Sequence, residues 1–429
     1  MKIYKVLFIA YYFPPKGLSG VQRPLKFAKY FPEFNWYPTV LTSGAGAYYA
    51  YDHEMLDEID TSKVKVVRVE GKEINARIKR AGKVKMPAEW FRKTLSFISS
   101  IFFVPDNKKP WAKAAFGKAI ELLSEEHYDL IFVTAPPFSS VSMAVDLKKR
   151  FNIPLVIDYQ DLWFGYQFAY YPTPMHKEYI YRKEYAALKT ADKITVTNRK
   201  IKETLIEVYK FIKHEDILIV PHGYDPSDIV KASARKKASD KMMLTYSGLF
   251  YEFITPKFFL KAFKVLALER PDIAANIELH FIGFLRDENK RLIKNLGIQN
   301  YVIEHGYLSH SAALEKVMMS DVLWMMVGYG RNAHTISSSK LYEYFGTEKP
   351  IMGFLPDGAL KSALQEYEAA YVCEPEDIKS IKKLIIDAYT QFREKALPKP
   401  NSDVVEKYNR VIITEQLTKE LQFVARERI

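Results

Sequence analysis

Residues 128–161, YDLIFVTAPPFSSVSMAVDLKKRFNIPLVIDYQD, hold two short apolar runs on either side of an amphipathic segment. The first run stops at Pro136 and Pro137, and the residues after them carry apolar side chains at helical spacing. Continuous apolar runs that end in turn residues indicate strands buried on both faces, and a helix between two such strands makes them parallel. The stretch therefore predicts one strand–helix–strand unit of a parallel sheet covered by helices.

The same alternation continues toward both ends of the chain. Strands are expected at 4–10, 37–43, 192–198 and 216–223, and helices at 21–31, 111–126 and 175–191. An alternation of this kind is typical of a doubly wound parallel sheet. In such sheets ligands bind beyond the carboxyl ends of the strands, so the loops after strands are where chemistry is expected.

The alternation is interrupted at the polar and basic segment 226–241, which has no apolar period and which we interpret as an interdomain linker. Beyond it, strands are expected at 242–248, 277–283, 301–308, 321–327, 350–354 and 369–375, with helices between them. A chain of 429 residues exceeds the usual size of one hydrophobic core. We predict two doubly wound α/β domains, at 1–225 and 226–401, with a ligand cleft between them and a final helix at 402–429.

The composition sets limits on the location of the protein. The single cysteine, Cys373, excludes an internal disulfide and suits a reducing compartment, and its strand-like surroundings predict a buried core residue. The first apolar run spans only about eight residues and precedes no small-residue cleavage site, so it indicates a strand rather than a signal peptide. No window reaches the roughly 18 apolar residues that a membrane span needs. We expect a cytoplasmic protein, or one that is peripheral to a membrane from that side.

The net charge of +12 is concentrated in part of the chain. Residues 72–93 carry eight Lys or Arg against two Glu, and the strongly apolar TLSFISSIFFVP follows them. Such a pair of segments, 72–104 together, suits the surface of an anionic membrane. The alternative is a solvated loop followed by a core helix, for which the spacing of Leu95, Ile98 and Phe102 also argues. Nucleic acid is not expected as a partner, because no stacking aromatics interleave the basic residues and no binding module is present.

The first loop that could carry chemistry follows the strand at 4–10 and contains Gly17 and Gly20 just before a helix. Glycines let a ligand approach the backbone, and a helix N-terminus offers N–H groups and a positive dipole end to phosphate. The pattern departs from the G-x-G-x-x-G of dinucleotide-binding loops. It is compatible with a phosphate contact or with a plain turn from strand to helix.

The second loop, in IDYQDLWFG, places Asp158 and Asp161 at the end of a strand. A carboxylate at this position could bind a sugar hydroxyl or accept a proton from an acceptor hydroxyl. The alternative is an aspartate that caps a helix.

Two further loops lie in the second domain. Gly248 ends a strand shortly before a helix, which is again a position for phosphate or sugar contacts. Residues 337–350, SSSKLYEYFGTEKP, begin a helix with hydroxyls, N–H groups and the cation of Lys340 at one end, and Glu343 follows one turn later on the same face. This combination suits a nucleotide diphosphate beside a ribose diol. The alternative is an exposed Lys–Glu pair on a helix surface.

Several segments together resemble bacterial glycosyltransferases of family 4. They are residues 11–43, FVPDNKKPW (103–111), VIDYQDLW (156–163), VPHGYD (220–225), YSGLFY (246–251) and the donor-site-like segment 320–354. The resemblance implies a GT-B fold, in which two Rossmann-like domains face each other across a cleft and the final helix crosses back to the first. It also implies an acceptor on the first domain, a nucleotide sugar on the second as co-substrate, retention of anomeric configuration and no required metal or cofactor.

The resemblance also assigns residues in the second domain. Glu343 would bind the ribose. Lys340, with Ser338, Ser339 and the backbone at Leu341, would meet the diphosphate and stabilise the departing nucleotide.

In the first domain, the resemblance implies that Gly20 and its neighbours close over the donor phosphates. Asp161 would present a polar group to the reacting sugar or acceptor, with Gln160 and Asp158 as further contacts.

Three positions depart from the family pattern. Many members have a second glutamate eight positions before the one at 343, where this chain has Thr335. Many also have an arginine after the glycine of the YSG loop, where this chain has Leu249, so Arg331 or Lys257 would have to supply that charge. The histidine often found in the first domain is missing from DYQD.

We therefore predict a retaining glycosyltransferase that uses a UDP- or GDP-sugar and acts on a glycan or lipid-linked acceptor in cell-surface polysaccharide synthesis, at the inner face of the plasma membrane. Two alternatives stay open at this point. One is another GT-B enzyme, such as a nucleotide-sugar epimerase. The other is a non-catalytic GT-B binding protein, which Thr335 and Leu249 would suit.

Overall fold

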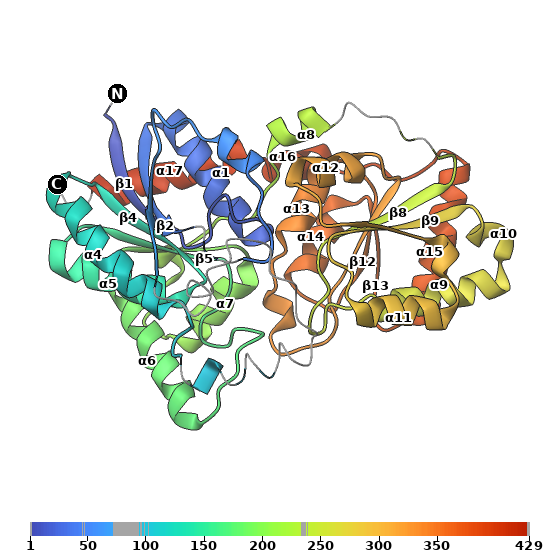
Figure 1. Cartoon of the computed structure of the whole chain (residues 1–429), viewed down its shortest axis with the longest axis horizontal. Coiled ribbons are helices and arrows are strands. Elements are labelled where there is room, and N and C mark those ends of the chain that lie inside the picture. Colours follow the sequence, from blue (N-terminus) through green and yellow to red (C-terminus); the bar gives the residue numbers. More distant parts are fainter. Residues whose placement is uncertain are drawn as a thin grey trace. The chain divides into compact units, whose positions relative to one another are not determined.

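The computed structural model describes residues 2–44, 46, 48–71, 94, 97, 99–101, 103–232, 237 and 239–426. The chain forms two compact units, Met1–Pro221 with Val411–Ile429 and His222–Arg410 (Figure 1). Each unit has a parallel sheet with helices on its faces, which confirms the predicted α/β class with two Rossmann-like domains. The chain passes from one unit to the other after Pro221 and again after Arg410.

The sheet of the first unit has the strand order β3-β2-β1-β4-β5-β6-β7. Its strands are β1 (Tyr4–Ile9), β2 (Trp36–Ser43), β3 (Lys65–Val69), β4 (Leu130–Ala135), β5 (Leu155–Tyr159), β6 (Lys193–Val196) and β7 (Ile217–Ile219). The winding direction changes between β1 and β4, which pair in parallel at the centre of the sheet. Ligand sites in such sheets lie at the carboxyl ends of the strands that flank this change.

Helices cover both faces of this sheet. They are α1 (Gln22–Tyr30), α4 (Lys109–Glu125), α5 (Phe138–Phe151), α6 (Pro174–Thr190), α7 (Arg199–Val208) and α17 (Arg410–Arg426). Successive residues of a strand point to opposite faces. Accordingly Leu7 packs in the core with α4 to α7, whereas Phe8 packs with α1 and α17. The final helix lies on the first unit, as predicted, and Figure 1 shows it in red among the blue elements.

The sheet of the second unit has the order β10-β9-β8-β11-β12-β13. Its strands are β8 (Met242–Ser247), β9 (Ile277–Ile282), β10 (Val302–Gly306), β11 (Val322–Met326), β12 (Ile351–Phe354) and β13 (Ala370–Cys373). Its helices are α8 (Pro226–Ala232), α9 (Lys257–Glu269), α10 (Pro271–Ala274), α11 (Asp287–Leu296), α12 (His310–Met318), α13 (Ser339–Gly346), α14 (Ala359–Tyr367), α15 (Ile378–Arg393) and α16 (Ser402–Lys407). Two cores cover the two faces of this sheet. Trp324 packs in one core with α9 and α15, and its neighbour Leu323 packs in the other core with α12 to α14.

The structure corrects the interpretation of 226–241 as a linker. This segment belongs to the second unit and begins with the helix α8. Asp225 caps that helix, because its carboxylate accepts two hydrogen bonds from Ser227, one from the N–H group (2.9 Å) and one from the hydroxyl (2.8 Å). This cap stabilises a helix in the first part of the segment. The helix was missed because the segment has no apolar period.

The final helix and the cysteine also differ from expectation. The predicted helix over 402–425 is two helices, because the N–H group of Tyr224 donates to the Tyr408 carbonyl (3.1 Å) and that of Arg410 donates to the Tyr224 carbonyl (2.9 Å). These bonds occupy backbone groups that a continuous helix would use. Cys373 is half-buried in β13 rather than buried in the core.

Most of the basic and apolar stretch 72–104 lies outside the described residues, including Leu95, Ile98 and Phe102. Among the residues that are described, no helix combines the length and the apolar character needed to cross a membrane.

Candidate functional site

The clearest candidate site in the second unit lies where α13 begins. Ser338 is the N-cap of α13, yet its side chain makes no capping hydrogen bond. The Ser338 hydroxyl and the N–H groups of Ser339 and Lys340 are thus left to a ligand, as at anion-binding helix N-termini. The Leu341 N–H group, by contrast, donates to the Ser338 carbonyl (3.1 Å). Lys340 lies in this turn, and its side chain lies against Gly248, where an added Cβ would collide with the Lys340 Nζ.

Glycines line the carboxyl edge of the sheet next to Lys340. Gly248, Gly283 and Gly306 lie at the ends of β8, β9 and β10, and the first two have φ values of +147° and +116°. The N–H group of Gly248 donates to the Ile282 carbonyl and that of Gly283 to the Gly306 carbonyl, both at 2.7 Å. Gly248 and Gly283 need glycine, and because they lack side chains a ligand can approach the backbone closely there, although their own N–H groups are occupied.

Few groups of the protein compensate the positive charge of the Lys340 ammonium for its loss of water. Burial lowers its pKa from 10.5 to about 8, and Glu343 acts in the opposite direction. Within the described part of the chain its Nζ has no hydrogen bond and no ion pair, and its nearest aromatic ring is that of Tyr246, with the centroid 5.9 Å away. A desolvated cation beside bare backbone suits an anionic ligand such as a diphosphate.

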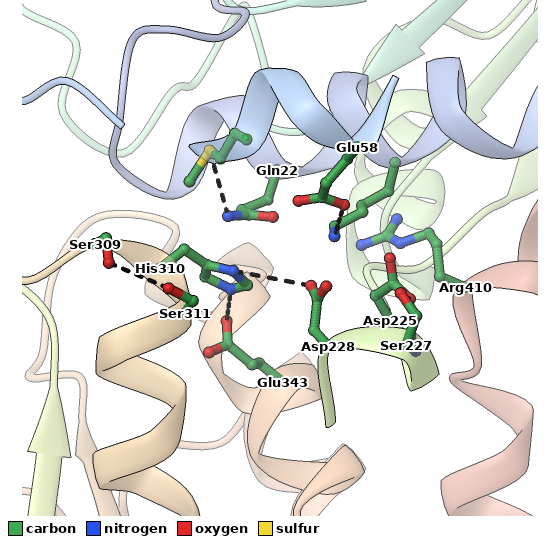
Figure 2. A network of polar contacts seen from close by, with 12 residues as sticks. Gln22, Glu58, Asp225, Ser227, Asp228, Ser309, His310, Ser311, Glu343 and Arg410 are labelled. Carbon is green, nitrogen blue, oxygen red and sulfur yellow. Dashed lines mark hydrogen bonds and ion pairs between the residues drawn. The ribbon is translucent and has the colours of Figure 1, made fainter. Parts of the chain in front are cut away.

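Glu343 is linked to a histidine that in turn faces a second carboxylate (Figure 2). The Glu343 Oε2 lies 3.5 Å from the His310 Nε2, and the Asp228 Oδ2 lies 3.8 Å from the His310 Nδ1. His310 begins α12 and Asp228 belongs to α8, so three helices meet at this point. The arrangement fixes the orientation of the Glu343 carboxylate, while 24% of its side chain stays exposed to meet a ligand.

Two neighbours of Glu343 fix α13 to the sheet. The hydroxyl of Tyr344 accepts a hydrogen bond from the N–H group of Ser247 at the end of β8 (2.8 Å). Leu341 is fully buried in the core beside α14. The predicted residues Ser338, Ser339, Lys340 and Glu343 therefore share one rigid element. Leu341 differs from the prediction, because its side chain faces the core and its N–H group already donates to the Ser338 carbonyl (3.1 Å).

Thr335 and Leu249, which stand where the family pattern has other residues, form hydrogen bonds within the protein. Thr335 is buried, and its hydroxyl donates to the Asn332 carbonyl (2.8 Å). The carbonyl of Leu249 accepts a hydrogen bond from the Tyr246 hydroxyl (3.0 Å). Arg331 is exposed in the loop between β11 and α13, and Lys257 is exposed at the start of α9. Neither cation lies as deep in the fold as Lys340.

In the first unit, the structure gives Asp158 an internal role in place of the predicted sugar contact. Asp158 is fully buried in β5, and its carboxylate accepts two hydrogen bonds from the buried Arg23 guanidinium (2.9 and 2.7 Å). The hydroxyls of Thr134 (3.0 Å) and Thr195 (2.7 Å) also donate to it. Arg23 in turn donates to the carbonyl of Val220 (2.9 Å). The aspartate thus joins α1 to the sheet and has no group left for a ligand.

Asp161 and Gln160 follow β5 in the loop and are half-buried. Burial raises the pKa of Asp161, and the Gln167 amide, which donates to its Oδ1 (3.0 Å), acts in the opposite direction. The amide of Gln160 donates to the Thr134 hydroxyl (2.8 Å). A carboxylate with a raised pKa is suited to accept a proton.

The two glycines predicted near the first strand have different surroundings. The N–H group of Gly17 donates to the Ala50 carbonyl (2.9 Å), so its backbone is already occupied. Gly20 is exposed in a short 3-10 turn over Ser19–Val21, and an added Cβ would meet nothing within 4 Å. Gly20 is therefore the one of the two that stays open to a ligand.

His310 and Asp228 were not predicted from the sequence. Both lie in polar surface-like segments, one at the start of a helix and the other inside the supposed linker. The sequence gives no signal for either, because their proximity to Glu343 depends on how three helices pack.

Comparison with known proteins gives independent evidence on the fold and on the family that the chain resembles. Residues 81–228 match the model of Glycosyltransferase Family 4. No curated protein matches the chain. A glycosyltransferase from Rickettsia africae has 13% identity and a TM-score of 0.64, with 99% of this chain and 100% of that one covered.

Two further solved structures share the fold over nearly the full length. Sucrose-phosphate synthase from Thermosynechococcus elongatus has 14% identity and a TM-score of 0.68, covering 98% of this chain and 99% of that one. Anabaena HepE, solved in complex with UDP and glucose, has 14% identity and a TM-score of 0.63, with the same coverage. At such identities the likeness establishes the fold alone.

Proposed function

We propose that the chain is a glycosyltransferase that transfers a sugar from a nucleoside diphosphate sugar with retention of configuration; its GT-B fold and the family 4 match over residues 81–228 support this proposal. The observation that carries the proposal is the Lys340 cation held against the bare backbone of Gly248, one turn before Glu343. The HepE structure, which contains UDP, supports a nucleotide as the ligand.

In this proposal the second unit binds the donor. Lys340, the hydroxyls of Ser338 and Ser339 and the N–H groups of Ser339 and Lys340 at the start of α13 bind the diphosphate. As the bond to the sugar breaks, negative charge grows on the leaving nucleotide, and a fixed cation and helix N-terminus stabilise that charge most when it is fully developed. Glu343 accepts hydrogen bonds from the ribose hydroxyls, and His310 keeps its carboxylate in place.

We also propose that the first unit binds the acceptor, a glycan or a lipid-linked saccharide of cell-surface polysaccharide synthesis, at the inner face of the plasma membrane. Asp161 accepts the proton of the attacking hydroxyl, which suits its half-buried position and raised pKa. Gln160 lies beside it as a further contact. Since Lys340 and α13 supply positive charge to the phosphates, we expect transfer to need no metal, and addition of EDTA should leave the rate unchanged.

Nucleotide binding tests the donor site directly. UDP and GDP are added to the full chain and the thermal midpoint is measured. Ligand at 100 times its dissociation constant should add about 2.7 kcal/mol of stability. The variant Glu343→Ala should lose about 2 kcal/mol of nucleotide binding, because a charged acceptor for the ribose is removed.

The matched control is Glu394→Ala, an exposed glutamate of the same unit, which should bind nucleotide as the unchanged protein does. Full nucleotide affinity in the Glu343→Ala variant would refute the ribose assignment. NMR of the product gives the anomeric configuration, and an inverted product would refute the retaining mechanism.

A further inference from the structure

A pocket in the first unit extends the proposed function. It is a cavity of about 270 Å³ at the carboxyl ends of β4 and β5, among described residues. Its walls include Phe103, Pro137, Phe138, Trp163, Tyr166 and Phe168. We propose that this pocket holds the apolar chain of a lipid-linked acceptor, an isoprenoid or acyl chain that carries phosphate. The proposal rests on the proposed function and names the class of its acceptor.

The walls of the pocket are aromatic rings that pack against one another. Phe138 and Trp163 stack with centroids 5.2 Å apart and planes 4° from parallel. Tyr166 meets Phe138 edge-on at 6.2 Å and Phe168 at 5.5 Å. Rings fixed in this way offer a large apolar surface at low entropic cost.

Two polar side chains of the walls, Asp106 and His176, already have partners within the protein, whereas the buried Trp163 Nε1 has none among the described residues. The Asp106 carboxylate accepts from the Ser139 N–H group (2.9 Å) and hydroxyl (2.8 Å). Both ring nitrogens of His176 are occupied, the Nδ1 by the Thr173 hydroxyl (2.8 Å) and the Nε2 by the Ile101 carbonyl (3.3 Å). Beside Asp106 and His176 the hydroxyls of a sugar ring would be buried without partners, which is costly, whereas a hydrocarbon chain needs none.

The pocket is bordered by large apolar side chains that are exposed. The exposed fraction is 46% for Phe97, 38% for Ile101, 39% for Tyr170, 81% for Met175 and 41% for Tyr179. The Phe97 and Tyr170 rings meet edge-on at 6.1 Å, and Tyr170 also lines the pocket. Exposed apolar side chains beside an apolar pocket are typical of a surface that meets lipid.

Positive charge accompanies this apolar border. Lys177 and Lys183 of α6 lie over the rings of Phe164 (5.8 Å) and Tyr179 (5.6 Å). Lysine next to apolar side chains matches an anionic headgroup above a hydrocarbon chain. The charge thus favours a phosphate-bearing lipid over a neutral apolar ligand.

The test is a series of n-alkyl phosphates of increasing chain length, kept below their micelle concentrations and titrated into the full chain by calorimetry. If the chain enters the pocket, the affinity should rise about fourfold with each added methylene until the pocket is full. The variant Ala169→Trp, which fills the pocket from its wall, should abolish this rise. The control Phe423→Ser removes an exposed aromatic ring of the same unit outside the pocket and should leave the series unchanged.

If Ala169→Trp fails to fold, the half-buried wall residue Phe168 is replaced by serine, which should lower the affinity for the longest chain at least tenfold. The same affinity at every chain length would overturn the proposal. Displacement of the longest alkyl phosphate by maltotriose would also overturn it, since the pocket would then hold sugar. UDP binding is measured on the same samples: a flat series in a protein that binds UDP rejects only the pocket, whereas a steep series without nucleotide binding rejects only the proposed donor function.

Discussion

Replacing Lys340 by methionine should make the protein more stable at pH 7 and weaken its binding of nucleotide. Methionine is similar in length and apolar, so it removes the charge with little change in packing. In the folded protein the Lys340 ammonium is desolvated and its pKa falls from 10.5 to about 8. The folded state therefore holds this proton less tightly than the unfolded state does.

The pH dependence follows from that difference. Between pH 8 and 10.5 the unfolded chain binds more protons at this site than the folded one, so stability rises with pH. Below pH 8 the cost of the charge is fully present, about 3 kcal/mol for a shift of this size. The gain from Lys340→Met should be about 3 kcal/mol at pH 7 and about 1.4 kcal/mol at pH 9.5.

Urea unfolding at the two pH values measures the gain, and UDP titration measures the loss of affinity. A charge-assisted contact to phosphate contributes about 2 kcal/mol, so UDP should bind roughly thirtyfold more weakly to the variant. The control is Lys399→Met, an exposed lysine of the same unit, for which both quantities should stay unchanged. A variant that is less stable at pH 7 would refute the cost of burying this charge, and one that binds UDP normally would refute the assignment of Lys340 to the diphosphate.

Three further replacements test other parts of the structure. Asp158→Asn leaves the buried charge of Arg23 without its partner and should lower the free energy of unfolding by about 3 to 5 kcal/mol, measured with urea. Burial raises the pKa of Glu184 from 4.5 to about 7, so the unchanged protein loses stability as the pH rises through that range. Glu184→Gln should therefore be about 2 to 3 kcal/mol more stable at pH 8 than the unchanged protein. His310→Ala frees the Glu343 carboxylate and should weaken UDP binding about fivefold, by calorimetry, without changing stability by more than about 1 kcal/mol.

For each of these three predictions, one outcome would contradict the reasoning. Asp146→Asn changes an exposed aspartate of α5 and should have no effect, so equal losses for Asp146 and Asp158 would show that the ion pair is not the cause. A stability gain for Glu184→Gln that is the same at pH 4 and pH 8 would exclude titration of the carboxyl. If Glu343→Ala and His310→Ala together weaken binding by the product of their single effects, the histidine does not act through the glutamate.

The fold was accessible from sequence because its signals are local. The apolar runs of β1, β4, β5 and β8 are bounded by turn residues, and each is followed by a helix with its own period. The strand β3 was not predicted, because it lies at an edge and each of its residues is exposed or only half-buried. Edge strands carry a weaker apolar signal than central ones.

The site was accessible only in part. The cation and carboxylate of α13 share one helix, so their spacing could be read directly from residues 337–350. The partner of Glu343, His310, comes from α12, and Asp228, which faces His310, comes from α8; both lie more than 30 positions from Glu343, and only the packing of helices brings them together. Asp158 was assigned to the site because it lies at a strand end, and sequence could not reveal that Arg23, 135 residues earlier, occupies it.

The packing of α17 also affects the order in which the chain becomes structured during synthesis. Leu417 and Leu421 lie in the same core as Val6 and Phe8, so the two ends of the polypeptide close one face of the first sheet. A nascent chain that has emerged as far as Pro221 has all seven strands of that sheet but not the helix that covers this face. The amino-terminal unit therefore reaches its full core only after the ribosome has completed the carboxyl-terminal one.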